Sequence, residues 1–269
     1  MSEAVLTRQP DMQTAAQVLL TDDEVISFII RGYHIIETDL PAAFHREVYA
    51  DLTQVLARSA ENPGDAILDL VPQLQQVWQH PAVHGALISL LGADYRMKSH
   101  RHCHVSLPGM RSQAWHQDGL NQRHHQIRVV LGFYYPQDVP EALGPTVILP
   151  GTHFRNAPTE LMATYANLRD QVLLTVRAGA VVLAHYDIWH AGTRNEGDTA
   201  RYMLKFLFDR LSDPSVPTWD HDPEQATRSL GRLTFEKACT CSQSDHYKER
   251  ALRREMWQHL VGASSAQFR

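Results

Sequence analysis

Cysteine is scarce in this chain, which has three cysteines among 269 residues. That number argues against the disulfide framework of a small secreted domain, so we expect reduced thiols in a cytoplasmic protein. Cys239 and Cys241 are two residues apart, but the chain lacks a second cysteine pair to complete a four-thiolate zinc site. We therefore assign no metal to the cysteines.

Long apolar runs are lacking as well. No stretch of about 20 apolar residues exists, so we expect no membrane span, and the first residues include an acid where a signal peptide has an apolar run. The formal net charge of −5 argues against nucleic acid or an anionic membrane as a partner. An apolar content of 43% and a charged content of 20% are ordinary for a globular enzyme and argue against disorder.

The residue pattern divides the chain into a helical beginning, a β core and a helical end. Capping residues and apolar spacing predict a helix from the cap Thr21 to Gly32, and further helices over 41–60, 80–91, 158–168 and 244–261. A short strand is expected at Tyr33–Ile36. From residue 95, short segments rich in β-branched and aromatic residues recur between Gly, Pro and Asn, over 97–107, 112–117, 127–135, 146–149, 171–176, 180–190 and 200–208.

Strands at this spacing predict a sandwich or a jelly roll. We expect a single domain over residues 1–269. Its helical N-terminal part covers 1–94, its mainly β core covers 95–210, and its helical C-terminal part covers 211–269.

Three pairs of a histidine and an acid two residues apart could bind a metal. They are His45-Glu47, His116-Asp118 and His185-Asp187. The first pair lies in a predicted helix, where residues two apart diverge by about 200°. On a strand, residues two apart share a face and lie about 6.7 Å apart along the backbone. Such a pair needs one further histidine to form the facial triad that binds Fe(II) and leaves positions open.

Strand alternation favours His190 as that further histidine. If residues 179–190 form one strand, His185 and His190 face opposite sides. A turn near 195–196 then places Arg201 opposite His190 in a hairpin, while the alternate residues of the returning strand form an apolar face. A guanidinium beside a metal ligand is suited to binding a carboxylate. Arg201 could therefore hold the distal carboxylate of a diacid whose other end occupies the open coordination positions of the metal.

A rival metal site is the row His100-x-His102-x-His104. The outer two histidines would lie about 13 Å apart on an extended strand. That separation is too large for one metal ion, so these side chains are expected to line a pocket or to pack.

The core motifs, taken in order over residues 98–208, resemble those of a known family. They are Trp115-His-Gln-Asp118, Tyr134-Tyr-Pro-Gln-Asp138, Gly144-Pro-Thr-Val-Ile-Leu-Pro-Gly-Thr-His153 and Gly179-Ala-Val-Val-Leu-Ala-His-Tyr-Asp-Ile-Trp-His190, with Arg201 eleven residues later. The set resembles the phytanoyl-CoA dioxygenase family of Fe(II)/2-oxoglutarate oxygenases. The resemblance implies a mainly β fold with flanking helices, built on a double-stranded β-helix, the jelly-roll core of cupin-like proteins.

The resemblance also implies the roles of individual residues. His116, Asp118 and His190 would hold Fe(II), and Arg201 would bind the C5 carboxylate of 2-oxoglutarate, with O₂ as the second co-substrate. Further contacts to 2-oxoglutarate would come from Tyr134, Thr146 and Gln117. Gly192, two residues after the last histidine, lacks the hydroxyl that some members place there. No side chain beyond the metal centre is needed as a catalytic group.

The expected reaction is the hydroxylation of an unactivated C–H bond in a small molecule, with release of succinate and CO₂. Retention of Asp118 favours hydroxylation, because halogenases of this superfamily have a small residue there. Two alternatives remain open: a non-catalytic metal-binding or sensor protein on the same fold, and a different metalloenzyme, such as a zinc hydrolase or a cupin-type isomerase. The basic residues near the metal strands hint at a polar or anionic substrate, and the substrate candidates are Lys98, His100, His102 and Arg128, with His125 in the same region.

Overall fold

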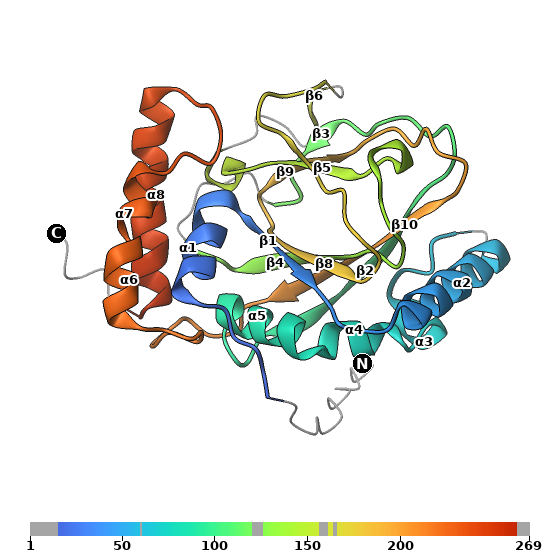
Figure 1. Cartoon of the computed structure of the whole chain (residues 1–269), viewed down its shortest axis with the longest axis horizontal. Helices are drawn as coiled ribbons and strands as arrows, with labels where there is room; N and C mark the ends of the chain where they lie inside the picture. Colours follow the sequence, from blue (N-terminus) through green and yellow to red (C-terminus); the bar gives the residue numbers. More distant parts are fainter. Residues whose placement is uncertain (1–15, 60, 120–125, 156–160, 164–165, 263–269) are drawn as a thin grey trace, which may run out of the picture.

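The larger sheet of the molecule has five antiparallel strands (Figure 1). The computed structural model describes residues 16–59, 61–119, 126–155, 161–163 and 166–262. The strand order is β1 (Tyr33–Glu37), β8 (Ala180–His185), β4 (Val129–Tyr134), β10 (Arg201–Asp209) and β2 (Arg96–Ser106). Because β1 pairs with β8, the sheet takes one strand from the chain before residue 95.

The smaller sheet lies above the larger one in Figure 1. Its strands are β6 (Leu161–Ala163), β3 (Trp115–His116), β9 (Trp189–Gly192), β5 (Thr146–Leu149) and β7 (Val172–Leu173), in that order and paired antiparallel. Two facing antiparallel sheets of this kind form a jelly roll. The predicted fold class is thereby confirmed.

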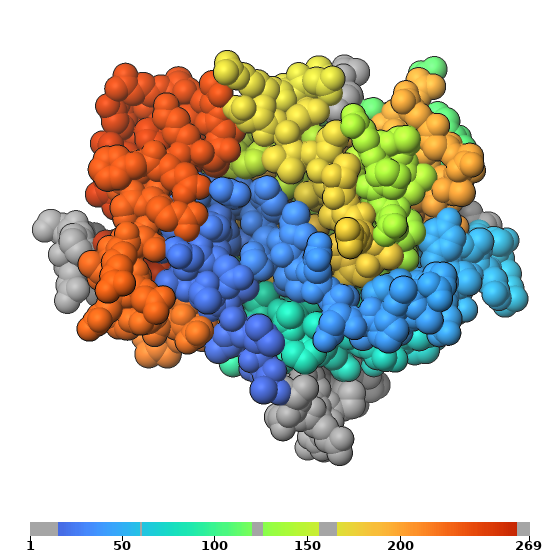
Figure 2. Space-filling model, in the orientation of Figure 1, coloured from blue at the N-terminus to red at the C-terminus, as the bar shows by residue number. Residues whose placement is uncertain are grey.

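Helices cover the outer face of the larger sheet and one side of the molecule. They are α1 (Asp22–Arg31), α2 (Ala42–Arg58), α3 (Ile67–Leu70), α4 (Leu74–Gln79), α5 (Pro81–Leu91), α6 (Pro223–Ser229), α7 (Gly231–Phe235) and α8 (Gln243–Leu260), with 3₁₀ turns η1 (Gly64–Ala66), η2 (Glu141–Leu143) and η3 (Thr152–Phe154). In Figure 1, α4 and α5 lie beneath the larger sheet, and the C-terminal helices stand beside α1. The surface of α1, in blue, meets that of the C-terminal helices, in orange (Figure 2). Among the described helices, none is long and apolar enough to cross a membrane.

Local sequence explains where α1 begins and ends. The Thr21 hydroxyl accepts a hydrogen bond from the Glu24 amide, and the Glu24 carboxylate accepts one from the Thr21 amide at 2.8 Å, which together form a capping box. Gly32 then adopts a left-handed φ of 83° and ends the helix. The predicted helix from Thr21 to Gly32 is confirmed.

Side chains alternate between two environments along β10. Phe206 faces the helices, where Trp78 of α4 stacks on it with ring centroids 4.8 Å apart. Met203 and Leu207 point the other way, into the apolar cluster between the two sheets. Since residues two apart share a face, Arg201 also faces the space between the sheets. The apolar face predicted for this strand is confirmed in Tyr202, Leu204, Phe206 and Phe208.

The helix predicted over residues 158–168 is wrong where the structure describes this segment. Residues 161–163 form β6, in which Leu161 and Ala163 pair with His116 and Trp115 of β3. Leucine, methionine and alanine favour a helix locally, but the free edge of β3 offers backbone partners that outweigh this propensity. Residues 156–160 and 164–165 lie outside the described part of the chain.

The single strand expected over residues 180–190 is also wrong. A turn closed by the Ile188 amide and the His185 carbonyl at 3.0 Å divides it into β8 and β9, which belong to different sheets. His190 and Arg201 are therefore not neighbours in a hairpin, because β9 pairs with β3 and β5 while β10 pairs with β2 and β4. Both halves of the segment are buried, so the apolar run gave no sign of the turn.

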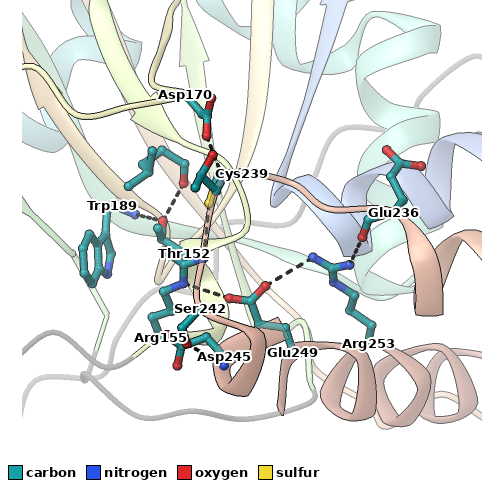
Figure 3. Close-up of polar contacts among 12 residues, drawn as sticks. Thr152, Arg155, Asp170, Trp189, Glu236, Cys239, Ser242, Asp245, Glu249 and Arg253 are labelled. Carbon is teal, nitrogen blue, oxygen red and sulfur yellow. Dashed lines mark hydrogen bonds and ion pairs between the residues drawn. The ribbon is translucent and has the colours of Figure 1, made fainter. Parts of the chain in front are cut away.

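A buried network of charges ties α8 to the jelly roll (Figure 3). Arg155 Nε donates to Glu249 Oε1 at 2.8 Å, and Arg253 Nη2 donates to Glu249 Oε2 at 3.4 Å. Arg253 Nη1 also donates to the carbonyl of Glu236 at 2.6 Å. Glu249 is 2% exposed, so it is the buried counter-charge for two guanidinium groups.

Replacing Glu249 with glutamine should destabilise the fold, because both guanidinium groups would lose their buried counter-charge. We expect Glu249→Gln to lower the free energy of unfolding by about 3 kcal/mol, measured by urea denaturation. The matched control is Glu255→Gln on the exposed side of the same helix, with an expected change within about 0.5 kcal/mol. Equal stability of the two variants would contradict the role given to this network.

Candidate metal centre

Three side chains from two neighbouring strands of the smaller sheet, β3 with the residues just after it and β9, converge at one point. One ligand atom from each of His116, Asp118 and His190 lies within 4.8 Å of the others. His190 Nε2 lies 3.6 Å from Asp118 Oδ2. This is the one such group of three or more His, Cys, Asp or Glu side chains in the described part of the chain, so neither the pair of α2 nor the row of β2 forms a second one.

Backbone pairing brings the two histidines together. His116 of β3 stands directly opposite His190 of β9, and the imidazole centroids are 4.3 Å apart. Each ring donates from Nδ1 to the carbonyl two residues before it, at 3.0 Å to Ala114 and at 3.1 Å to Ile188. These bonds orient the rings and leave both Nε2 atoms as ligands.

The start of β9 is held in place by a hydroxyl. Thr152 Oγ1 accepts a hydrogen bond from the amide of Trp189 at 3.0 Å and donates to the carbonyl of Leu149 at 2.6 Å (Figure 3). Thr152 is fully buried, so it links the end of β5 to the residue before His190. Thr152 thus helps to fix the position of His190 relative to β5.

The acidic ligand has a cationic partner. Lys205 of β10 reaches across from the larger sheet, and its Nζ donates to Asp118 Oδ2 at 2.8 Å. Burial alone would raise the pKa of the Asp118 carboxyl, but His190, Lys205 and His116 outweigh it and lower that pKa to about 2. Burial lowers the pKa of His190 to about 4, although Asp118 opposes this shift. Asp118 is therefore ionised and His190 neutral near pH 7, as metal ligands must be.

A cavity opens beside the two histidines, and residues of both sheets line it. Arg201 lines the cavity and is 5% exposed, and among the described residues no partner lies within hydrogen-bond distance of its Nε and Nη1 atoms. A buried guanidinium with two free donors costs free energy unless an anion binds it, so this end of the cavity fits a carboxylate.

Tyr135, rather than the predicted Tyr134, faces the space between the sheets where Arg201 lies. Tyr134 faces the helices, and its hydroxyl bonds with His45 Nδ1 of α2 at 2.8 Å. Tyr135 points between the sheets and donates to Thr146 Oγ1 at 3.1 Å, close enough to Arg201 for the two side chains to interact electrostatically. Successive residues of a strand point to opposite faces, so Tyr134 and Tyr135 lie on different sides of the sheet. The prediction chose the residue that faces away from Arg201.

The other two residues expected near the co-substrate lie in different places. Thr146 is buried and lines the cavity. Gln117 is buried as well, but it does not line the cavity, since it alternates with its neighbours His116 and Asp118.

None of the substrate candidates that the structure describes lines the cavity. Lys98 pairs with Asp209 at 3.3 Å, and Arg128 is exposed and bonds to Gln126. His100 is exposed, and His102, two residues further along β2, is half-buried. His125 lies outside the described residues. His104, the third member of the row, is the one that lines the cavity.

Sequence reasoning missed Lys205 and Gln113 as members of this site, whereas His104 belongs to the row that was expected to line a pocket or to pack. Lys205 is a cation between apolar residues of β10, and it lies four residues after Arg201, on the same face of the strand. This spacing could have indicated that both side chains enter the cavity. Gln113 lines the cavity and its Oε1 accepts from the Gly192 amide at 2.9 Å. A Cβ built on Gly192 would lie 3.0 Å from that oxygen, so Gln113 occupies the space that a side chain at position 192 would need.

Two histidines and one carboxylate on one side of an ion are the ligand set of non-haem ferrous oxygenases, and they leave further coordination positions open. Arg201 lines the same cavity, and its guanidinium could bind a carboxylate there. The donors present therefore fit a ferrous ion and a small dicarboxylic acid together.

Comparison with protein families gives one match over most of the chain. The model of the phytanoyl-CoA dioxygenase family matches residues 15–203. Among curated proteins, no sequence matches the chain.

Solved structures with the same fold include the following three. The α-ketoglutarate-dependent carbocyclase SnoK from nogalamycin biosynthesis is 20% identical, with a TM-score of 0.57 over 79% of this chain and 94% of its own. The non-haem monooxygenase ThoJ is 17% identical, with a TM-score of 0.58 over 86% and 98%. HygX from Streptomyces hygroscopicus, solved with nickel and 2-oxoglutarate, is 12% identical, with a TM-score of 0.59 over 71% and 87%.

Replacing Asp118 with asparagine should weaken metal binding, because the amide has no charge to attract the ion. We expect Asp118→Asn to reduce Mn²⁺ affinity at least tenfold in isothermal titration calorimetry, since the loss of a mere partner of a ligand already costs about 10- to 100-fold. The control is Glu47→Gln in the helical His-x-Glu pair of α2, which should bind Mn²⁺ like the wild type. Unchanged affinity in Asp118→Asn would place the metal elsewhere.

Proposed function

Because the chain belongs to the phytanoyl-CoA dioxygenase family, we propose that it is an Fe(II)/2-oxoglutarate-dependent dioxygenase that hydroxylates an unactivated C–H bond of a small molecule. His116, Asp118 and His190 hold the ferrous ion. 2-Oxoglutarate and O₂ are the co-substrates, and succinate and CO₂ are released.

The observation that carries this proposal is Arg201. Its guanidinium is buried, lacks described partners at two nitrogens and opens into the cavity that His116 and His190 also line. We assign it to the C5 carboxylate of 2-oxoglutarate, for which its planar pair of donors is suited. Thr146 lines the same end of the cavity, and Tyr135, which donates a hydrogen bond to Thr146, takes the place of Tyr134 beside the proposed co-substrate site.

When bound, the ferrous ion with 2-oxoglutarate and O₂ supplies the oxidising chemistry at the C–H bond. The chain's own residues hold the metal and orient the co-substrate. The carbonyls of Ala114 and Ile188 fix both imidazoles, and Arg201 sets the direction of the co-substrate. No side chain is required to remove a proton from the substrate.

Arg201 also bears on the alternatives. A zinc hydrolase or a cupin-type isomerase has no need of a buried unpaired guanidinium beside the metal ligands. A sensor without turnover could use one, and it is distinguished by the absence of succinate formation. SnoK, which shares this fold, is an α-ketoglutarate-dependent carbocyclase, so product analysis must accompany any turnover assay.

Removing the guanidinium should weaken 2-oxoglutarate binding and leave the metal in place. We expect Arg201→Ala to raise the 2-oxoglutarate concentration at half-maximal succinate release by about 100-fold, because two charge-assisted hydrogen bonds are lost. Mn²⁺ affinity should stay within about threefold of the wild type, since Arg201 is not a ligand.

The matched control for this variant is Arg128→Ala, whose side chain is exposed and outside the cavity. It should keep the wild-type requirement for 2-oxoglutarate. If Arg201→Ala lost the metal instead, or kept the wild-type requirement, the assigned role would be wrong.

A further inference from the structure

Building on the proposed function, we propose that Lys205 and His104 bind the anionic group of the substrate, and that the substrate is a small molecule with one carboxylate on a largely apolar body. The two residues lie on adjacent strands, β10 and β2, in the wall of the larger sheet that faces the metal ligands.

The charges around the cavity are of one sign. The described lining contains the cations Arg111, Arg201 and Lys205 and no carboxylate. Asp118 is the acid beside it, and Lys205 donates to that carboxylate at 2.8 Å with 8% of its own side chain exposed. An ammonium group this buried requires an anionic partner.

Metal binding changes the partner that Lys205 has. A divalent ion held by Asp118 takes up the charge of that carboxylate and repels the ammonium beside it. The two charges of the ion are then balanced by Asp118 and by the chelating carboxylate of the co-substrate. The distal carboxylate of the co-substrate balances Arg201. The charge of Lys205 is then the one left without a counter-charge, which favours a substrate that brings a single negative charge.

Position on the strand separates the two cations. Lys205 lies four residues after Arg201 on the same face of β10, about 13 Å further along. The co-substrate end and the Lys205 end of the cavity are therefore distinct, and one small molecule anchored at Arg201 leaves the other end available.

His104 adds a polar atom and neighbouring residues add an apolar wall. His104 stands opposite Met203 on β2, and no described partner lies within hydrogen-bond distance of its buried Nε2. Burial and the charge of Lys205 lower the pKa of His104 to about 3, so its neutral ring can donate from Nε2 without adding charge. Val105, Met110 and Met203 line the same cavity and suit an apolar body beside the anionic group.

The test uses the full chain loaded with Fe(II) and 2-oxoglutarate under anaerobic conditions. Octanoate and octanamide are the two probes, because they share an apolar chain and differ in charge. Each is titrated while the visible charge-transfer band of the loaded protein is followed, and binding is measured in parallel by isothermal titration calorimetry.

We expect octanoate to shift the band without abolishing it, and to bind about 10- to 100-fold more tightly than octanamide, as is usual for one buried charge-assisted contact. Lys205→Met should remove that preference. Lys205→Arg keeps the positive charge and should retain most of it. Lys98→Met, which removes a lysine paired with Asp209 outside the cavity, should behave like the wild type.

Three results would overturn the proposal: equal binding of the two probes to the wild type, a preference that persists in Lys205→Met, or loss of the band with octanoate, which would mean competition at the metal. A Lys205→Met protein that needs about 100-fold more 2-oxoglutarate would instead assign Lys205 to the co-substrate. If the wild type gave no band at all, the proposed function itself would fail, and the substrate site with it.

Discussion

The alternation of side chains along β10 and β4 is the constraint on which the site depends. One face of each strand packs on the helices through residues such as Phe206 and Tyr134, and the other faces the smaller sheet. The apolar face anchors β10 so firmly that Arg201 and Lys205 have to point between the sheets. Two cations are thereby held in a buried space, where they require anions. The proposed carboxylate site and the proposed negative charge of the substrate both follow from that requirement.

Sequence patterns predicted the chemistry of the centre better than its architecture. The jelly roll, the cap of α1 and the apolar face of β10 follow from local signals, and the structure brings His116, Asp118 and His190 together as expected. The hairpin used to choose His190 does not exist, because the chain turns after β8 and changes sheet. His190 instead meets His116 across a strand pair that joins distant segments, and no local pattern reports such a pairing.

Residues whose position depends on a neighbouring sheet were the ones missed. Tyr134 and Tyr135 are adjacent in the sequence, so a motif cannot separate them, whereas the pleat sends them to opposite layers. Lys205 meets Asp118 only because two sheets face each other. The basic residues chosen by proximity in sequence, Lys98 and Arg128, instead lie outside the cavity. Which basic side chains enter the cavity is a property of packing and not of composition.

The most direct test of the central claim is an anaerobic titration of the wild-type protein with Fe(II) and 2-oxoglutarate. A ferrous ion held by two histidines and one carboxylate has open positions for a bidentate 2-oxo acid, and that complex absorbs weakly in the visible range. We expect a band that requires both Fe(II) and 2-oxoglutarate and reaches its maximum at one equivalent of each. A protein that binds Fe(II) but gives no band at saturating 2-oxoglutarate would contradict it.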